Sequence, residues 1–158
     1  MHDIHIGAKR IGQGHPVFII AELGYNFTST EEALESVDAA ADCGVDAIKV
    51  QTFKAETTTT NTVDFPAEAG GSNQFEEFKQ YEISEEVHRL IQERANRRGL
   101  VFFSTPSYKD DVDLLDRLDV AIHKVGSDDL TNLPFIDYVA RSGKPVIFSS
   151  GMATLAEV

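Results

Sequence analysis

The segment DAIKVQTF, residues 46–53, sets Lys49 and Gln51 among closely spaced apolar side chains. Nearly continuous apolar residues over so short a run favour a strand of a parallel sheet that is covered on both faces. A lysine inside a buried strand is costly unless its ammonium group meets an anion. Two interpretations follow: either Lys49 lies near an open strand end and faces an anion, or the segment is not a strand.

Four further segments share this apolar character, and helical patterns separate them. The first helical pattern opens with Ser29 and Glu32 at the spacing of a capping box, and Gly44 can end it. This strand–helix order predicts an α/β fold with parallel strands and right-handed crossovers. The predicted strands are 17–24, 46–53, 100–106, 120–127 and 145–151, and the predicted helices are 29–44, 84–99, 108–119, 133–143 and a last one that begins at 154–158.

Two segments fall outside this alternation. Residues 4–18, IHIGAKRIGQGHPVF, resemble a small hairpin that leads into the first strand. Residues 55–83 are rich in Thr, Gly and Glu and are only weakly periodic. Loops of that length in a compact domain are usually functional lids or disordered segments, and we expect one of the two here.

Composition excludes several classes of protein. The chain of 158 residues has a net charge of −12, from 26 acidic and 14 basic residues, which argues against general binding to nucleic acid or to anionic membranes. No apolar run approaches the roughly 20 residues that span a bilayer, and the polar start MHDIHIGAKR is not a signal peptide. The lone cysteine, Cys43, rules out an internal disulfide framework and is expected to be buried. We therefore expect a cytoplasmic protein with small-molecule partners.

Polar residues gather where each predicted strand ends. In parallel α/β folds the ligand site lies at these carboxyl ends, so side chains from different strands meet there. Two lysines and several hydroxyl groups suit an anion such as a phosphate or a carboxylate. The residues concerned are Glu22, Asn26, Lys49, Gln51, Ser104, Thr105, Lys124, Ser127, Asp129, Ser149 and Ser150.

Each of these residues also has a purely structural interpretation. A serine or threonine at a strand end is often a helix cap, and Lys49 or Glu22 could each be one partner of a salt bridge. His123 precedes Lys124 and is expected to point the other way, into the layer between sheet and helices. The other four histidines, His2, His5, His15 and His88, show no metal-ligand spacing. The joint placement of the polar residues, rather than any one of them, indicates a functional site.

Four motifs resemble the sialic acid synthase family, the NeuB-type N-acetylneuraminate synthases. They cover essentially the whole chain in order and at matching spacing: FIIAELGYN (18–26), DAIKVQTFKAE (46–56), VFFSTPSYKDDVDLL (101–115) and HKVGSDDLTNLPFIDYVARSGKPVIFSSGMATLAEV (123–158). The resemblance implies a (β/α)₈ barrel of the TIM type, usually followed by a small antifreeze-like domain. Residues 1–158 would then be the N-terminal portion of the barrel, with five strand–helix units, and the later strands and the antifreeze-like domain would be absent.

The resemblance also implies a reaction. Members of the family condense phosphoenolpyruvate with an N-acetylated hexosamine, typically N-acetylmannosamine, to give a sialic-acid-type nonulosonate and phosphate. They need a divalent metal, Mn²⁺ or Mg²⁺, whose ligands would not lie in this chain. We therefore expect the chain alone to be inactive, and the full-length enzyme to be a homodimer.

Roles can be carried over residue by residue from the matching motifs. Lys49 and Lys124 resemble the lysines that hold phosphoenolpyruvate, and Glu22 resembles an active-site acid near the metal and the acceptor. Two departures stand out, because Phe27 replaces a frequent histidine and Asp128 lies where a glycine is common. The remaining matches are hydroxyl partners of the anion (Thr105, Ser127 and Ser149) and residues that contact the acceptor sugar (Gln51, Asn73 and Asp129).

Three alternatives stay open at this point. The chain could belong to another phosphoenolpyruvate-condensing barrel, such as a synthase of a keto-deoxy sugar acid phosphate. It could be a class I aldolase in which Lys124 forms a Schiff base. It could also be a non-catalytic half-barrel that only binds an anion or a partner chain.

Overall fold

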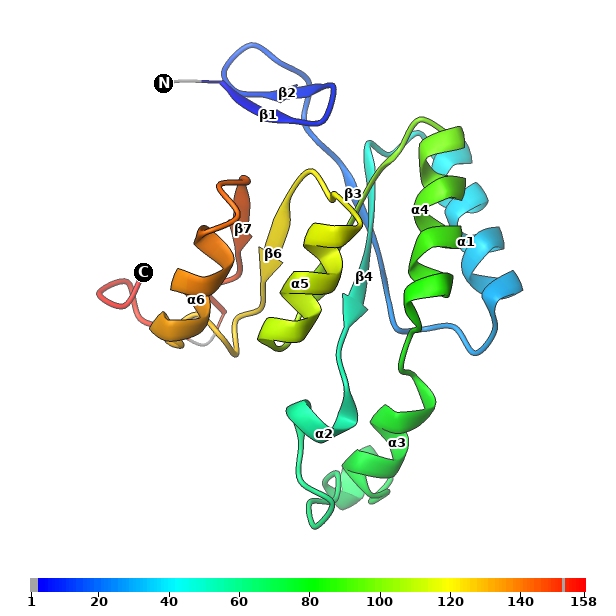
Figure 1. Ribbon diagram of the computed structural model, residues 1–158, viewed down its shortest axis with the longest axis vertical. Helices are drawn as coiled ribbons and strands as arrows, with labels where there is room; N and C mark the ends of the chain where they lie inside the picture. The colour runs from blue at the N-terminus through cyan, green and yellow to red at the C-terminus, as the bar shows by residue number, and fades with distance from the viewer. Residues whose placement is uncertain (1–2, 152) are drawn as a thin grey trace.

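The computed structural model describes residues 3–151 and 153–158 and shows an α/β protein (Figure 1). Parallel strands alternate with helices in the predicted order, and a short antiparallel hairpin precedes them. The elements are β1 Ile4–Ile6, β2 Lys9–Ile11, β3 Ile20–Gly24, α1 Thr30–Asp42, β4 Ala47–Thr52, α2 Ala55–Thr58, the 3₁₀ turn η1 Ala67–Ala69, α3 Gln74–Gln80, α4 Glu85–Arg97, β5 Val101–Pro106, α5 Lys109–Arg117, β6 His123–Val125, α6 Leu133–Ala140 and β7 Val146–Phe148.

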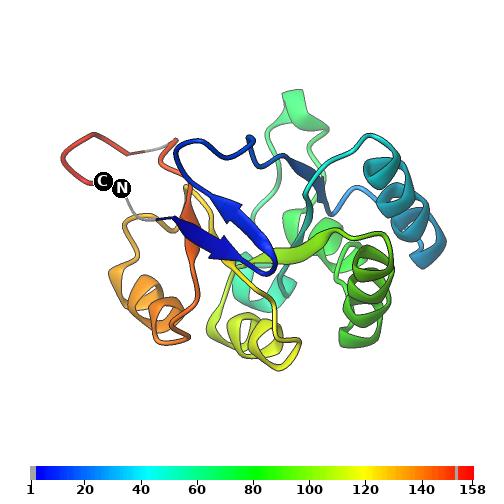
Figure 2. The same cartoon turned by 90° about the horizontal axis from the view of Figure 1, so that it is seen from above.

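The parallel strands lie side by side in chain order. β3, β4 and β5 form one hydrogen-bonded sheet, β6 and β7 form a second pair, and β5 packs against β6. Helices α1, α4, α5 and α6 follow one another along one side of these strands (Figure 2). The predicted α/β alternation and N-terminal hairpin are therefore confirmed, whereas closure into an eight-stranded barrel stays a prediction.

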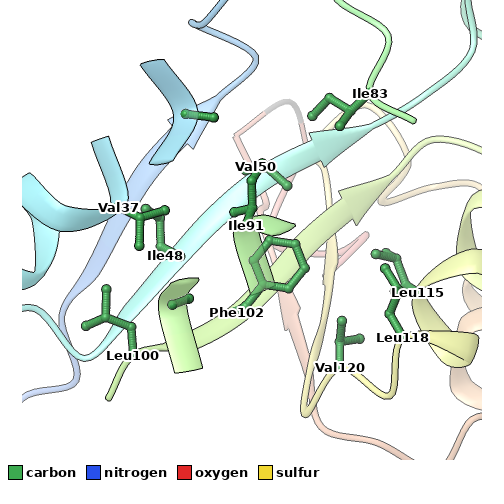
Figure 3. Close-up of a cluster of buried hydrophobic side chains, with 12 residues drawn as sticks. Val37, Ile48, Val50, Ile83, Ile91, Leu100, Phe102, Leu115, Leu118 and Val120 are labelled. Carbon is green, nitrogen blue, oxygen red and sulfur yellow. The ribbon is translucent and has the colours of Figure 1, made fainter. Parts of the chain in front are cut away.

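Alternation along each strand divides the apolar residues between two layers. Ile48 and Val50 of β4 point toward the helices and pack with Val37 of α1 and Ile91 of α4 (Figure 3). Successive side chains of a strand point to opposite faces, so Lys49 points to the other, inner face. At the start of the strands this inner face is apolar, because Ala47, Phe103 and Ile122 pack there against Ile6 of the hairpin.

Local sequence signals explain where the helices begin and end. Ser29 accepts a hydrogen bond from the Glu32 N–H, which is half of the predicted capping box, whereas the Glu32 carboxylate accepts from the N–H of Thr28, one residue before the N-cap. Gly44 follows α1 with a φ of 77°, a conformation that only glycine adopts without strain. The caps explain why the α1 boundaries match the sequence pattern so closely.

Three structural expectations were wrong or only partly right. Cys43 is exposed rather than buried, because it is the C-cap residue of α1, beyond the last turn that packs on the sheet. Residues 154–158 make the predicted contact between Thr154 and Glu157 but form a turn, since so few residues close a single i to i+3 bond. The strand predicted from residue 17 begins at Ile20.

The segment that follows β4 is ordered, so the expectation of disorder was wrong, whereas a role as a lid stays a prediction. Residues 53–83, here called the arm, hold α2, η1 and α3 and lie beyond the ends of the strands (Figure 1). Aromatic rings join the arm to the body, since Tyr25 lies edge-on to both Phe53 and Phe78, with ring centroids 5.7 and 6.4 Å away. Edge-to-face pairs of this kind stabilise a fold beyond the area that they bury. Among the residues described, no helix has the length and apolar character needed to cross a membrane.

Candidate active site

A cavity of about 310 Å³ opens where the parallel strands end. Its walls come from strands β3, β4, β5 and β6 and from residues that follow β5, β6 and β7, so residues far apart in the sequence meet there. Seven of the nine predicted site residues line this cavity, and the prediction that they gather at one place is confirmed in that respect. The lining residues are Glu22, Lys49, Gln51, Thr105, Ser107, Lys124, Gly126, Ser127, Asp128 and Ser149.

Lys49 is a buried cation on the inner face of β4, with 6% of its surface exposed. Its Nζ lies 2.7 Å from Glu22 Oε2 and 2.8 Å from Thr105 Oγ1, and a longer contact of 3.5 Å reaches the Val50 carbonyl. Glu22 pairs in register with Lys49 on the neighbouring strand β3. The first interpretation of Lys49 therefore holds: it lies in a strand near an open end, and the anion that it faces is the protein's own carboxylate. The alternative that the segment is not a strand is wrong.

Lys124 lies on the inner face of β6, and its contacts differ from those of Lys49. Its Nζ donates hydrogen bonds of 2.6 Å to both the Val125 carbonyl and the Ser149 hydroxyl. Within the described chain no carboxylate forms an ion pair with it. Because an ammonium group has three N–H donors, one donor remains for a ligand. Burial, and after it the nearby charge of Lys49, lowers the pKa of Lys124.

The turn after β6 places a carboxylate at the cavity wall. A side chain at Gly126 would overlap the Asp128 carboxylate, so this close approach requires glycine. Asp128 and Ser107 line the cavity although the sequence did not mark them as site residues. The signal for Ser107 was its position directly after the strand 100–106. The family resemblance assigns the contact with the acceptor sugar to the neighbouring Asp129, so it does not point to Asp128.

Two predicted sugar contacts do not reach the cavity wall. Asp129 accepts a hydrogen bond of 3.1 Å from the Asn132 amide, and burial raises its pKa. Asn73 caps α3 by accepting from the Glu76 N–H, and its amide donates to Asp64 Oδ1 at 3.1 Å. Both side chains are engaged in local structure, so their contact with a sugar stays a prediction.

Comparison with models of protein families shows the family to which this chain belongs. The model of the NeuB family matches residues 36–158. The chain belongs to the NeuB family. The sequence resemblance to this family is thereby confirmed.

Individual NeuB-family relatives agree with that assignment. The N,N'-diacetyllegionaminic acid synthase of Legionella pneumophila is 40% identical over 96% of this chain, and the pseudaminic acid synthase of Campylobacter jejuni is 38% identical over 90%. The crystal structure of an N-acetylneuraminic acid synthetase from Leptospira borgpetersenii, in complex with citrate, covers 99% of the chain with a TM-score of 0.87 and 32% identity. The chain spans 44% and 43% of the two curated relatives and 52% of the crystallised chain.

The NeuB-family cavity carries charges of both signs. Lys49 and Lys124 face Glu22 and Asp128, and the hydroxyl groups of its wall can accept or donate. In the part of the chain that the structure describes, no three His, Cys, Asp or Glu side chains lie close enough to hold a metal ion. These residues therefore do not make a metal site by themselves, and the expected Mn²⁺ or Mg²⁺ stays a prediction.

His123 has the structural role that the sequence indicated. Its side chain is fully buried on the helix-facing side of β6, and its Nε2 lies 3.0 Å from Asp116 Oδ1 of α5. Burial lowers its pKa, although the carboxylate of Asp116 opposes that effect. His123 thus fixes α5 against β6, while the adjacent Lys124 points into the cavity.

Proposed function

We propose that this NeuB-family chain supplies the phosphoenolpyruvate site of a condensing enzyme. The enzyme would join phosphoenolpyruvate to an N-acetylated hexosamine, N-acetylmannosamine or a related sugar, and release a sialic-acid-type nonulosonate and phosphate. The observation that carries the proposal is the convergence of two lysines and three hydroxyls on one cavity at the strand ends: Lys49, Lys124, Thr105, Ser127 and Ser149. The names of the relatives, legionaminic and pseudaminic acid synthases, support the reaction class.

The two lysines would receive the anion in different ways. A phosphate or carboxylate can take the third N–H of Lys124 directly, because that donor has no protein partner among the described residues. At Lys49 the same anion has to displace the Glu22 carboxylate, which is 50% exposed and can swing into solvent. Charge-assisted bonds from both ammonium groups then hold the anion in place before reaction, so little reorganisation is needed.

Anion binding would in turn prepare the acceptor side. Once displaced from Lys49, the Glu22 carboxylate is free to accept hydrogen bonds from hydroxyls of the sugar, and Gln51 adds an amide at the same wall. In the reaction, the methylene carbon of phosphoenolpyruvate attacks the aldehyde carbon of the open-chain sugar. Water adds to the resulting oxocarbenium carbon, and phosphate leaves. The lysines hold the phosphate and carboxylate, and the cavity aligns the two reacting carbons.

Calorimetric titration of phosphoenolpyruvate tests the assignment of the lysines. A charge-assisted hydrogen bond is worth about 1.5–3 kcal/mol, so Lys49→Met and Lys124→Met should each weaken binding roughly tenfold to a hundredfold. Lys109→Met is the matched control, since Lys109 lies on α5 over the ring of Tyr138 and away from the cavity. Unchanged affinity in both cavity variants would remove the anion-site assignment.

A class I aldolase is the second candidate, and one observation favours it. Burial and the neighbouring cation lower the pKa of Lys124, and a lysine needs a lowered pKa to form a Schiff base at neutral pH. Borohydride trapping with pyruvate distinguishes the two reactions, because only a Schiff base is reduced to a stable adduct. We expect no adduct at Lys124.

The remaining expectations concern the complete enzyme. Product analysis with phosphorylated and N-acetylated acceptors separates the proposed reaction from that of a keto-deoxy sugar acid synthase. Residues 1–158 alone should bind phosphoenolpyruvate without turning it over, since the described residues hold no metal site. The divalent metal, the homodimer and the cytoplasmic location are predictions of the same proposal.

A further inference from the structure

A chain of buried polar groups lies behind the cavity, on the helix-facing side of β4 and β5. His88 of α4 joins the Ser84 carbonyl through Nδ1 at 2.8 Å and the Thr52 hydroxyl through Nε2 at 2.8 Å. The Thr52 hydroxyl lies 2.6 Å from the Ser104 hydroxyl, which lies 3.0 Å from the Val50 carbonyl. All three side chains, His88, Thr52 and Ser104, are at most 3% exposed. We call these groups the polar chain.

Residues of the polar chain and residues of the cavity are neighbours along the same two strands. Thr52 is next to Gln51 on β4, and Ser104 is next to Thr105 on β5, so each pair shares a strand but points to opposite faces. The register pairs Val50 with Ser104 and Gln51 with Thr105. Thr52 itself pairs with Pro106, so the contact between Thr52 and Ser104 crosses diagonally from β4 to β5 over the Gln51–Thr105 rung, which carries two cavity residues.

Its surroundings are apolar, which makes the polar chain a costly feature. Val50, Ile83 and Ile91 belong to the hydrophobic cluster of this layer (Figure 3). Hydroxyl and imidazole groups buried there without hydrogen bonds would destabilise the folded state. Apolar residues of similar shape would not carry that cost. Packing of the hydrophobic core does not require polar residues at these three positions. Their presence therefore indicates that they hold β4 and β5 in a fixed relative position.

Counting hydrogens shows how the polar chain is directed. It has four contacts and ends in carbonyl oxygens at both sides, which only accept. Neutral His88, Thr52 and Ser104 supply one hydrogen each, and a carbonyl partner requires the hydrogen of His88 on Nδ1. Nε2 then accepts from Thr52, so three hydrogens serve four contacts, and the one hydrogen of Ser104 is shared between the Val50 carbonyl and the Thr52 oxygen. The imidazole thus sets the direction of the Thr52 hydroxyl.

We propose that His88, as the neutral Nδ1–H tautomer, is a positioning residue that acts through Thr52 and Ser104 to hold the ends of β4 and β5 in the register that brings Lys49 to Thr105. The Lys49–Thr105 contact of 2.8 Å crosses between the same two strands on the cavity side. Only the ligand-binding part of this inference rests on the proposed function. Burial lowers the pKa of His88, and the charged groups that act on it are Lys54, which lowers the pKa, and Glu85, which raises it.

Nuclear magnetic resonance of the 158-residue chain tests the positional role without any ligand. Thr52→Val keeps the shape and removes the hydroxyl, Thr52→Ser restores it, and Ile91→Val trims a methyl group from the same layer without touching the polar chain. In the wild type, the imidazole spectrum should show the proton of His88 on Nδ1. Thr52→Val should shift the amide signals of Gln51 and Thr105, while Thr52→Ser and Ile91→Val leave them nearly unchanged.

Phosphoenolpyruvate affinity provides the second measurement on the same variants. Thr52→Val should weaken binding about fivefold, the scale of one buried hydrogen bond, with less than about a twofold change in Thr52→Ser and Ile91→Val. If Thr52→Val only lowers the melting temperature, as Ile91→Val does, and shifts neither amide signal, the positional role is wrong. A proton on Nε2 of the wild type would also overturn it. If the wild type binds no phosphoenolpyruvate, the proposed function fails, and the amide signals still decide the role of His88.

Discussion

The inner face of the parallel strands has two ends with opposite chemistry. Where the strands begin, Ala47, Phe103 and Ile122 pack against Ile6 of the hairpin and exclude water. Where they finish, the next inward positions are Lys49 and Thr105, and they line an open cavity. On β4 and on β5, the residue that packs in the apolar end and the residue that lines the cavity are thus only two positions apart. The apolar end fixes the strands, and the polar end can then hold charged groups at set distances.

Removing the largest side chain of the apolar end should have the largest effect. Phe103 is fully buried, and replacing a buried phenylalanine with alanine typically costs about 3–5 kcal/mol. Urea denaturation of Phe103→Ala measures this loss. Phosphoenolpyruvate affinity, measured on the folded fraction at low temperature, should change much less. A loss below about 1 kcal/mol would mean that packing at this end does not carry the stability.

The turn that ends β5 gives the second prediction, which depends on pH. Asp111 accepts hydrogen bonds from the Ser107 and Tyr108 N–H groups, and burial raises its pKa from 3.8 to about 6. A carboxyl whose pKa is raised on folding destabilises the fold once it ionises. Its contribution is therefore most favourable below about pH 4 and falls by about 2–3 kcal/mol as the pH rises past 6.

Asp111→Asn isolates that contribution. The asparagine oxygen can still accept both N–H groups but carries no charge. The difference in the free energy of unfolding between variant and wild type should therefore grow in favour of the variant by about 2–3 kcal/mol from pH 4 to pH 7. Denaturant titrations at several pH values give this difference. A constant difference across that range would contradict the raised pKa.

Glu22 offers a smaller change at the polar end. Glu22→Gln removes the charge that competes with an incoming anion for Lys49 but keeps the shape. Because Glu22 is half exposed, the gain is limited to about 1 kcal/mol or less, so phosphoenolpyruvate should bind roughly three- to fivefold more tightly. The gain should shrink at high salt. Weaker binding would show that Glu22 helps the anion instead of competing with it.

Cys43 gives the smallest expected effect and lies outside both ends. Since it is exposed at the C-terminal end of α1, Cys43→Ser should leave stability and ligand binding unchanged. The native thiol should react completely with a thiol reagent in the absence of denaturant. Protection of the thiol would restore the prediction that it is buried.

Periodicity was sufficient to predict the parallel strands and the four long helices, because burial on both faces leaves an unmistakable apolar run. It could not set the strand starts, since Val17 and Ile19 are apolar but exposed and unpaired in any strand of the described chain. The short helices of the arm could not be predicted for a related reason. Its short helices pack through a few aromatic rings, and a helix as short as α2 is too brief to show a period.

The site was predictable to the extent that backbone topology determines it. Strand ends converge in any parallel sheet, so Lys49 and Lys124 could be placed together from the sequence alone. Side chains on the turns were not predictable, because their direction depends on local contacts. Asp128 turns into the cavity wall over Gly126, whereas Asp129 and Asn73 hydrogen-bond within their own segments.

The arm also changes the path by which the chain must find its own fold. β3 pairs with β4 from Ile20 to Ala47, whereas β4 pairs with β5 from Ala47 to Val101, about twice as far along the chain. Bringing the ends of a loop together costs only about 0.6 kcal/mol more for each doubling of its length. A segment as long as the arm can therefore vary in sequence and length between relatives at little thermodynamic cost. What it delays is the encounter of β4 with β5, so the slowest step of folding should be the pairing of these two strands.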